Sequence, residues 1–345
     1  MKIKKLKEKL VEFPDYLKSW VKSFTGGVTV FCLVILGLIP YLSQNESFIN
    51  TILRQFSLAM IFAIFAASWD FLTGIAGQIS FGHAIFFGIS GYITAYFSTP
   101  EYGNFPIPLA FVVGVVGSVL FGLIIGIPCL RLRGPYLALG TLAMSLVLLR
   151  LFLMGSLSDI FFGSEGISDP AFKLSLVFDP IIEYFIIFIS MVIVFIVIIH
   201  ISKSKFGTIL KSIRDDETGA NASGINTTRY KVYAFMLSSL FAGIAGSFYA
   251  TWAGAVNPTG NFGTVISFFA ILMASLGGIT TIRGSALGAF FFIFLEYTLI
   301  AIGAELYVHL IFAIILIITI RFAEHGILRP ILEHLKDLWD FLLGR

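Results

Sequence analysis

Glycine and polar residues interrupt one of the most apolar parts of the chain, in the stretch TGIAGQISFGHAIFFG at residues 73–88. Glycine lets a backbone turn or approach a neighbouring helix closely, and the residues expected to do so are Gly74, Gly77 and Gly82. Polar side chains can satisfy the backbone groups that a broken helix leaves free inside a membrane, and they can also line a pathway across it. The candidates for both roles are Gln78, Ser80 and His83.

Charged residues within apolar segments form a second set of candidates, because charge is costly in lipid and usually has a function there. Asp70 and Arg150 lie near the ends of such segments, where they can simply reach an interface. Glu296, in FFIFLEYTLI, must instead face the protein interior, carry a proton or find a donor. It is a further candidate for the translocation pathway, although one buried carboxylate is weak support for a proton relay.

The longest polar stretch, at residues 202–231, contains TILKSIRDDETGANASGI. Ile209 and Ile213 can share one helical face, and Gly224 is a plausible C-terminal stop. A disordered linker would need neither the apolar residues nor the stop. We therefore favour a short helical element that docks a partner, with the disordered linker as the alternative.

Recognisable catalytic spacings are missing from the sequence. It lacks a phosphate-binding G-x-x-x-x-G-K-[ST] loop, a dinucleotide-binding glycine fingerprint and the paired histidines of zinc proteases. It also lacks the G-x-S-x-G sequence of hydrolases. Two cysteines, Cys32 and Cys129, make neither a disulfide framework nor a metal site. We expect a chain that is not an enzyme, with no catalytic residue, no metal site and no cofactor of its own.

The composition identifies the elements that must position these residues. Of 345 residues, 57% are hydrophobic and 12% are charged, and the mean hydropathy is +0.94. A soluble domain carries about twice that share of charge. The apolar runs are continuous rather than alternating, which excludes a β-barrel. They lie at roughly 27–42, 51–69, 83–98, 107–128, 135–155, 181–200, 232–252, 264–282, 285–303 and 305–320. The fold predicted is an all-α polytopic membrane protein with about ten transmembrane helices, eight to ten being possible.

The distribution of basic residues predicts the orientation. With the N-terminus inside, 20 of the 23 lysines and arginines fall on inner segments, which fits the positive-inside rule and puts both termini in the cytoplasm. Three parts follow. Residues 1–26 are an amphipathic cytoplasmic or interfacial helix, residues 27–320 are the transmembrane domain with its inner loop at 202–231, and residues 321–345 are a cytoplasmic tail. The external loop 156–180 is acidic and can dock an external partner or simply be exposed.

Three stretches resemble the LivM-type permeases of branched-chain amino acid ABC importers. They are SWDFLTGIAGQISFGHAIFFGISGY at 68–92, KSKFGTILKSIRDDETGANASGINTTRYKVYAFMLSSLFAGIAGSFYA at 203–250, and LMASLGGITTIRGSALGAFF at 272–291. The resemblance extends from about residue 50 to 320, and the order and spacing of the stretches are specific. The third stretch contains Gly277 and Gly278, which join the glycines expected to break or pack a helix.

The resemblance implies a multi-pass permease subunit in the plasma (inner) membrane of a prokaryote. It implies a heterodimer with a LivH-type permease, two cytoplasmic ATPases that bind ATP and magnesium, and an extracytoplasmic binding protein that delivers the amino acid. The residues that it places at the ATPase contact are Arg214, Asp215, Asp216, Glu217 and Gly224. The match is loose here, because the wider importer motif begins Glu-Ala-Ala and reaches its glycine six residues after the glutamate. In this chain Thr218 and Gly219 follow Glu217, and Gly224 is seven residues on.

Two alternatives stay open at this point. The same superfamily includes permeases for urea and short amides, and residues 68–92 do not discriminate between these substrates. A secondary carrier driven by an ion gradient is the alternative of a different class, with Glu296 or Asp70 as its coupling group. Broken helices also occur in such carriers. A carrier, however, has no need of the RDDE-containing inner loop.

Overall fold

The computed structural model describes residues 24–41, 46–129, 132, 134–157, 162–169, 173–174, 179–322 and 326. The predicted N-terminal interfacial helix at 1–26 lies outside the described residues except for its last three. The predicted tail at 321–345 also lies outside them, except for Arg321, Phe322 and Gly326. The chain divides into two units, of which one comprises 1–53 with 330–345 and the other comprises 54–329.

Helices make up nearly all of the described structure. The smaller unit holds α2 (Phe24–Leu38), the short helix η1 (Ile39–Tyr41) and the first turns of α3 (Glu46–Asp70). The larger unit continues α3 through η2 (Phe71–Ile75) and then contains α4 (Ala84–Ser98), α5 (Ile107–Cys129), α6 (Pro135–Phe152), η3 (Gly155–Leu157), β1 (Ile167–Ser168), α9 (Pro180–Lys203), α10 (Lys205–Asp215), α11 (Glu217–Ala222), α12 (Thr227–Ala253), β2 (Ala255–Val256), α13 (Pro258–Phe262), α14 (Thr264–Gly277), α15 (Ile282–Ala301), η5 (Glu305–Tyr307) and α16 (Val308–Phe322).

Seven helical segments of the described residues are long and apolar enough to cross a membrane, which confirms the expected all-α polytopic class. They are Ile49–Ile75, Ile107–Pro128, Pro135–Phe152, Pro180–Lys203, Thr227–Ala253, Pro258–Gly277 and Ile282–Ala301. Three shorter apolar segments, Thr29–Tyr41, Ala84–Ser98 and Glu305–Thr319, coincide with the remaining apolar runs of the sequence. The number ten and the cytoplasmic placement of the termini stay predictions.

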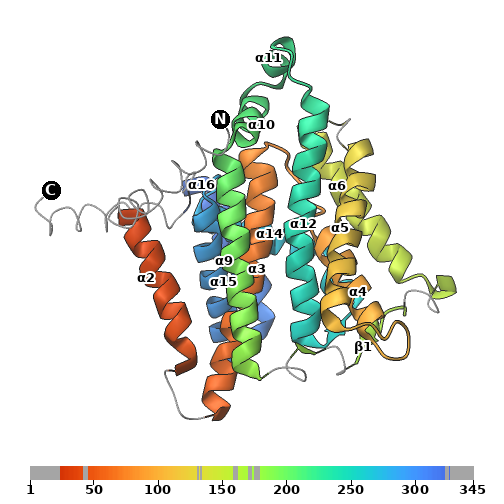
Figure 1. The fold of residues 1–345 in the computed structure, drawn as a ribbon, viewed down its shortest axis with the longest axis vertical. Coiled ribbons are helices and arrows are strands. Elements are labelled where there is room, and N and C mark those ends of the chain that lie inside the picture. Colours follow the sequence, from red (N-terminus) through yellow and green to blue (C-terminus); the bar gives the residue numbers. More distant parts are fainter. Residues whose placement is uncertain are drawn as a thin grey trace, which may run out of the picture. The chain divides into compact units, whose positions relative to one another are not determined.

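The second half of α3 is the centre of the larger unit. Residues 59–72 are all buried, and a helix that is apolar and buried on every side belongs inside a bundle. Helices α4, α5 and α12 pack against one another in pairs beside it, and their ribbons run side by side in Figure 1. Phe65 of α3 lies against Phe87 of α4, with ring centroids 4.9 Å apart. The 71–83 stretch therefore leaves the most buried helix of this unit.

Small residues bring these helices close together. A Cβ atom added to Gly246 of α12 would collide with the carbonyl oxygen of Phe87 in α4, and one added to Gly243 would collide with Ser118 of α5. Ser118 uses this proximity, because its Oγ donates to the carbonyl oxygen of Phe86 at 3.0 Å and that of Ser239 at 2.8 Å. In lipid, close packing and hydrogen bonds between helices replace the hydrophobic effect as the force for association. Small residues therefore form tight contacts between these helices.

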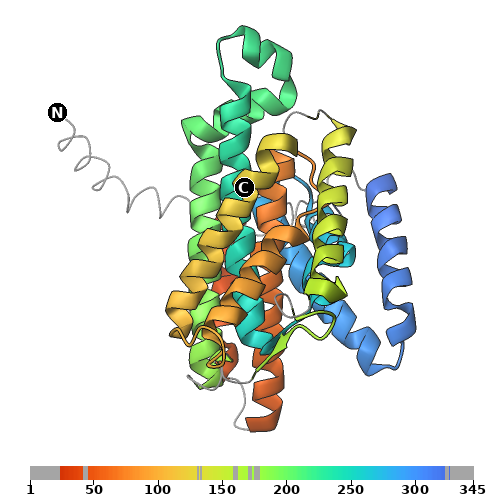
Figure 2. The same ribbon diagram turned by 90° about the vertical axis from the view of Figure 1, so that its right-hand side faces the viewer.

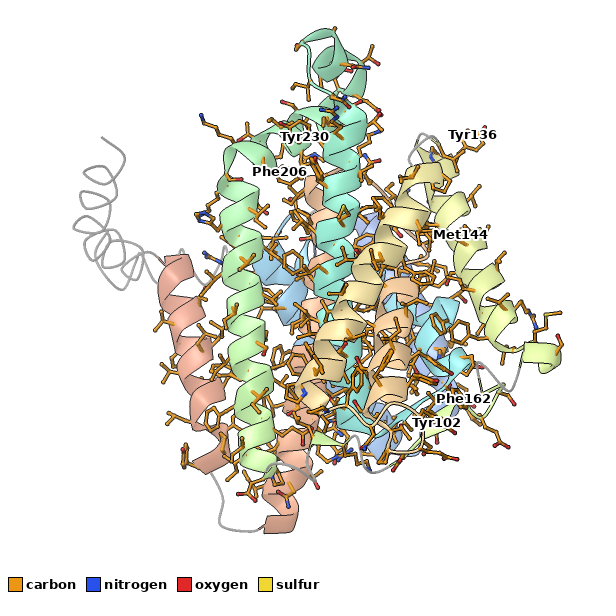
Figure 3. All side chains as sticks on the ribbon, turned by 45° about the vertical axis from the view of Figure 1, so that its right-hand side comes forward. Tyr102, Tyr136, Met144, Phe162, Phe206 and Tyr230 are labelled. Atoms are coloured by element: carbon orange, nitrogen blue, oxygen red, sulfur yellow. The ribbon has the colours of Figure 1, made fainter. Side chains whose placement is uncertain are left out.

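The two ends of the larger unit bring different loops together. At one end, β1 pairs antiparallel with β2, so the 156–180 loop meets the turn that follows α12. Tyr102 and Phe162 lie together at this end, with ring centroids 4.9 Å apart (Figure 3). At the other end lie α10 and α11, with α11 at the apex in Figures 1 and 2. The alternation of inner and outer segments along the chain stays a prediction.

Candidate functional site

Three segments that lie far apart in the sequence meet at the α10 end of the larger unit. They are the stretch from the end of α3 to the start of α4, the α10–α11 pair, and the turn between α14 and α15. Each contains residues that the sequence analysis singled out. We call the place where they meet the junction, defined by Asp70, Gly74, Gly77, Arg214 and Thr280.

The α3 helix changes its winding before it ends. It continues beyond Asp70 as a π-helix, Phe71–Ile75, and leaves helical structure at Gly77, whose φ is +69°. Single π-turns within α-helices occur frequently at functional sites. A residue with a Cβ atom would be strained at this φ, so a glycine is required here. The chain becomes helical again only at Ala84.

Arg214 of α10 holds this irregular segment. Its Nη1 donates to the carbonyl oxygen of Gly74 at 2.7 Å, and its aliphatic carbons occupy the space beside Gly77 where a side chain would otherwise lie. Its Nε and Nη2 donate to Oδ1 of Asp215 at 3.0 and 2.9 Å. A π-helix leaves carbonyl groups without their usual backbone donors. The Arg214 guanidinium donates to one of these, the carbonyl group of Gly74.

Asp70 connects the same segment to the α14–α15 turn. Its Oδ1 accepts a hydrogen bond from the backbone N–H of Thr280 at 2.7 Å, and the side chain is completely buried. Gly74 leaves room for this contact, because a Cβ atom there would collide with both partners. Gly277 of α14 packs directly on the carbonyl group of Gly284 in α15, and neither glycine has space for a side chain. The junction therefore joins the three segments through hydrogen bonds between side chains and backbone groups.

The α11 helix stands out from the junction and is attached to α12 at its first turn. The Asp216 side chain caps its first turn by accepting from the N–H of Thr218 at 2.9 Å. Glu217 forms an ion pair of 2.6 Å with Lys231 of α12, which is 3% exposed. Gly224, with a φ of +83°, ends the helix. Phe206 of α10 and Tyr230 of α12 add a ring contact with centroids 5.7 Å apart (Figure 3).

The surface of α11 is free for a partner within the part of the chain that the structure describes. The residues of α11 and its C-terminal turn that are exposed are Thr218, Asn221, Ala222, Ser223 and Gly224. Ala220 is buried against the bundle. A helix with one buried anchor and a polar, exposed face is suited to receive a second protein while staying attached to the spans beneath it.

The polar candidates of the 73–88 stretch lie in the packed interior. The side-chain amide of Gln78 donates to the carbonyl oxygen of Ala76 at 3.1 Å. Ser80 is buried, its carbonyl oxygen accepts from Trp69 Nε1 at 2.7 Å, and its hydroxyl has no partner in the described structure. His83 lies between aromatic rings, and its Nε2 is 2.8 Å from Ser68 Oγ. A role in lining a pathway stays a prediction for all three.

The remaining glycines and Glu296 occupy different places. A Cβ atom on Gly82 would collide with the carbonyl oxygen of Thr141 in α6, so this glycine packs the entry to α4 against another span. Gly278, with a φ of +97°, begins the α14–α15 turn. Glu296 is partly exposed on α15, near Tyr249 of α12. Since it follows Thr280 by sixteen residues, it lies about 24 Å along the helix from the junction.

Sequence reasoning overlooked two contributors to this site. Thr280 acts only through its backbone N–H, so its side chain carries no signal. Lys231 could have been noticed, because a lysine in the first turns of an apolar helix must find an anion or water. No group of three or more His, Cys, Asp or Glu residues placed to hold a metal occurs among the described residues.

Comparisons with known proteins complete the description. A family model described as "Branched-chain amino acid transport system / permease component" matches residues 51–320. The LivM permease of the high-affinity branched-chain amino acid transport system of Salmonella typhimurium is 26% identical over 284 residues, which are 72% of this chain and 62% of that protein. The chain thus spans less than two thirds of the length of the LivM relatives that it matches.

Two other curated relatives match over shorter stretches. The probable branched-chain amino acid transport permease LivH of Methanocaldococcus jannaschii is 29% identical over 143 residues, covering 39% of this chain and 44% of that protein. The autoinducer 2 import permease LsrC of Yersinia pestis is 32% identical over 94 residues, covering 26% of this chain and 27% of that protein. No solved structure matches the chain.

Proposed function

The chain belongs to the branched-chain amino acid transport permease family, and on that premise we propose that it is the membrane-spanning permease subunit of an ATP-driven importer. It translocates branched-chain amino acids that an extracytoplasmic binding protein delivers, in the plasma membrane of a prokaryote. The family description and the LivM relatives support this substrate class. Urea, short amides and autoinducer 2, the last carried by the shorter LsrC match, are the substrates against which it must be tested.

The subunit works with partners in this proposal. A LivH-type permease forms the second half of the membrane domain, and two cytoplasmic ATPases bind and hydrolyse ATP with magnesium. The chain itself performs no covalent chemistry. Its task is to alternate between outward-open and inward-open arrangements, which requires elements that move together and a segment where they can bend.

The observation that carries the proposal is the attachment of the α10–α11 pair to two different spans. Arg214 connects α10 to the carbonyl group of Gly74, and Glu217 connects α11 to Lys231. A displacement of α11 by an ATPase therefore reaches the end of the buried α3 helix and the start of α12 at the same time. A soluble linker between two spans would need neither contact.

The π-helix is where such a displacement can change the structure. A π-turn and an adjacent glycine with positive φ can change backbone angles at lower cost than a regular helix, and hinges consist of a few such residues. The Asp70–Thr280 hydrogen bond carries the movement on to the α14–α15 turn. The three segments that meet at the junction then move as one body. The serine- and glycine-rich packing of α4, α5 and α12 keeps these helices together.

The ion-coupled carrier gains no support from the geometry. Its two candidate groups are Asp70, which is held by a backbone N–H in the junction, and Glu296, which lies about 24 Å away along α15. Either residue alone would be the coupling group of a carrier. Asp70 is already bonded to a backbone N–H, and Glu296 is partly exposed on α15.

Reconstitution tests the proposal directly. The chain is co-expressed with a second permease, two ATPases and a binding protein of the same transport system, and uptake of labelled leucine into proteoliposomes is measured. We expect uptake that requires ATP, magnesium and the binding protein and that is insensitive to ionophores. Competition with unlabelled valine, urea and autoinducer 2 then identifies the substrate class. Concentrative uptake by the permease without an ATPase, driven by an ion gradient, would reject the proposal.

A further inference from the structure

Charged side chains also lie toward the end of the larger unit opposite the junction. Arg54 precedes Asp70 by sixteen residues in α3, so it lies about 24 Å from the junction at roughly 1.5 Å per residue. Glu183 lies in the first turn of α9 at this end, and Trp252 is the penultimate residue of α12. All of these residues belong to the larger unit.

Arg54 is held in place by an aromatic ring. Its Cζ lies 4.8 Å from the centroid of the Trp252 ring, a distance at which a guanidinium is attracted to the face of an indole. Arg54 itself is exposed. A guanidinium that stacks on a ring keeps its N–H groups, which point outward in its plane, available for a carboxylate.

Glu183 is a buried carboxylate without a bonded partner. Its side chain is 7% exposed, and within the described residues it forms no ion pair and no side-chain hydrogen bond. Arg54 and Lys173 are the cations whose charge acts on it, but neither approaches to salt-bridge distance. The first turn of α9, where Glu183 lies, favours negative charge through the helix dipole. Its oxygen atoms are not among the solvent-inaccessible polar atoms of the described structure that lack a partner, so they keep contact with solvent and a cation can reach them.

A buried donor at the same place also lacks a partner. The indole Nε1 of Trp252 is inaccessible to solvent and has no hydrogen-bond acceptor in the described structure. Buried tryptophan N–H groups usually find an acceptor. An aromatic ring adjoins Trp252, since Tyr249 lies 6.0 Å from it, measured between ring centroids.

We infer that these groups form a weak binding site for a zwitterionic amino acid at the outer entrance of the permease. The α-carboxylate binds to Arg54, the α-ammonium binds to Glu183, and an apolar side chain lies against the rings of Tyr249 and Trp252. Two opposite charges that do not pair with each other complement a molecule that carries both. The inference rests on the proposed function and gives it a point of contact with the substrate.

The site explains how a permease can accept an amino acid released by a binding protein without retaining it. An ion pair at an exposed guanidinium is worth little, so affinity in the millimolar range is expected. Recognition then depends on the presence of both charged groups rather than on the side chain. Urea and autoinducer 2, which are not amino acids, would be poor ligands.

Saturation-transfer NMR on the leucine methyl protons tests the site in the assembled permease–ATPase complex, in lipid nanodiscs without the binding protein or ATP. The probes are leucine, leucinamide, which lacks the carboxylate, and 4-methylpentanoate, which lacks the ammonium. We expect saturable leucine binding with a Kd of about 1 mM and binding of either analogue at least about fivefold weaker.

Two variants test which residue binds each charged group of leucine. Glu183→Gln should weaken leucine binding about tenfold and abolish the preference for leucine over 4-methylpentanoate. Arg54→Gln should abolish the preference for leucine over leucinamide. Asp179→Asn is the matched control, because this exposed carboxylate is at the same helix end and caps nothing with its side chain; it should change binding less than twofold.

Unsaturable binding, equal binding of the three probes, or equal effects of Glu183→Gln and Asp179→Asn would overturn the site. The same preparation, completed with the binding protein and ATP in proteoliposomes, separates this result from failure of the proposed function. Leucine uptake by a wild-type complex that shows no discrimination among the probes rejects the site alone. Absence of any ATP-driven uptake rejects the function on which it rests.

Discussion

Arg214 of α10 donates a hydrogen bond to the carbonyl oxygen of Gly74 across 140 residues of sequence, with 2.7 Å between the two atoms. The same side chain covers Gly77, the residue at which the chain leaves helical structure. One arginine thus contacts both the π-helix and the turn that follows it. The contact places the polar loop predicted to dock an ATPase directly on the break in the most buried helix of the larger unit.

Arg214→Ala should uncouple ATP hydrolysis from transport. The substitution removes the donor that binds α10 to Gly74, and we expect uptake per ATP hydrolysed to fall about tenfold, a coupling free energy of about 1.4 kcal/mol. Uptake and ATPase activity are measured together in proteoliposomes. Lys205→Ala is the control, since it removes an exposed charge of the same helix and should alter the ratio little. An unchanged ratio in Arg214→Ala would refute the coupling role.

Gly77→Ala should destabilise the protein through both its backbone and its contact with Arg214. A Cβ atom at a φ of +69° is strained by about 1 kcal/mol, and here it would also displace the arginine side chain. Gly303→Ala provides a matched control, because Gly303 has a φ of +76° and open space around it. We expect a lower midpoint of thermal unfolding and lower uptake for Gly77→Ala. Equal effects of the two substitutions would show that only backbone strain destabilises Gly77→Ala and that its contact with Arg214 contributes nothing.

Glu217→Ala should weaken the attachment of α11 by leaving the ammonium of Lys231 buried without its anion. A loss of about 1–2 kcal/mol is expected, discounted because Glu217 is partly exposed. The double variant Glu217→Ala with Lys231→Met should recover much of this loss, since it removes the unpaired charge. The measurement is the thermal unfolding midpoint of the purified subunit, followed by retention of the ATPases. A double variant no better than Glu217→Ala alone would contradict the pairing.

Asp70→Asn separates structural from ion-coupling roles of this residue. Asparagine keeps an oxygen that can accept from the N–H of Thr280, so stability and ATP-driven uptake should stay close to wild type. Asp70→Ala removes the acceptor from a buried N–H and should cost about 1–3 kcal/mol. Both are compared by thermal unfolding and by uptake. Loss of transport in a stable Asp70→Asn protein would favour the ion-coupled carrier.

Ser80→Ala should affect passage of the substrate more than stability. The serine hydroxyl is buried without a partner in the described structure, so its removal costs no hydrogen bond and should leave the unfolding midpoint nearly unchanged. Uptake kinetics then report whether this hydroxyl faces the pathway in another state of the transport cycle. A parallel Gln78→Ala variant loses its local hydrogen bond to Ala76 and should be somewhat less stable. Unchanged kinetics in both would assign these residues to packing.

Helical class and the location of the apolar runs were predictable from the sequence, because transfer from water to lipid is decided residue by residue. The glycines of the 73–88 stretch were also recognisable, because the conformational freedom of glycine is a property of the residue itself. Gly77 adopts a backbone conformation that other residues avoid. The RDDE-containing loop was recognisable as the longest polar segment between two spans. The division of this loop into α10 and α11 was not predictable from the sequence. Asp216 ends α10 and caps the first turn of α11, and a single residue with both roles leaves no separate turn sequence between the helices.

Partnerships across the bundle were decided only by the tertiary structure. Asp70 meets a backbone N–H 210 residues away, and no property of Thr280 in the sequence indicates this. Glu183, which the sequence analysis did not single out, is buried without a bonded partner, whereas Glu296, which it did, is partly exposed. The apolar content of a helix determines that it enters the membrane. Which of its faces meets another helix depends on packing among all of them, and this determines which charged and polar groups can act together.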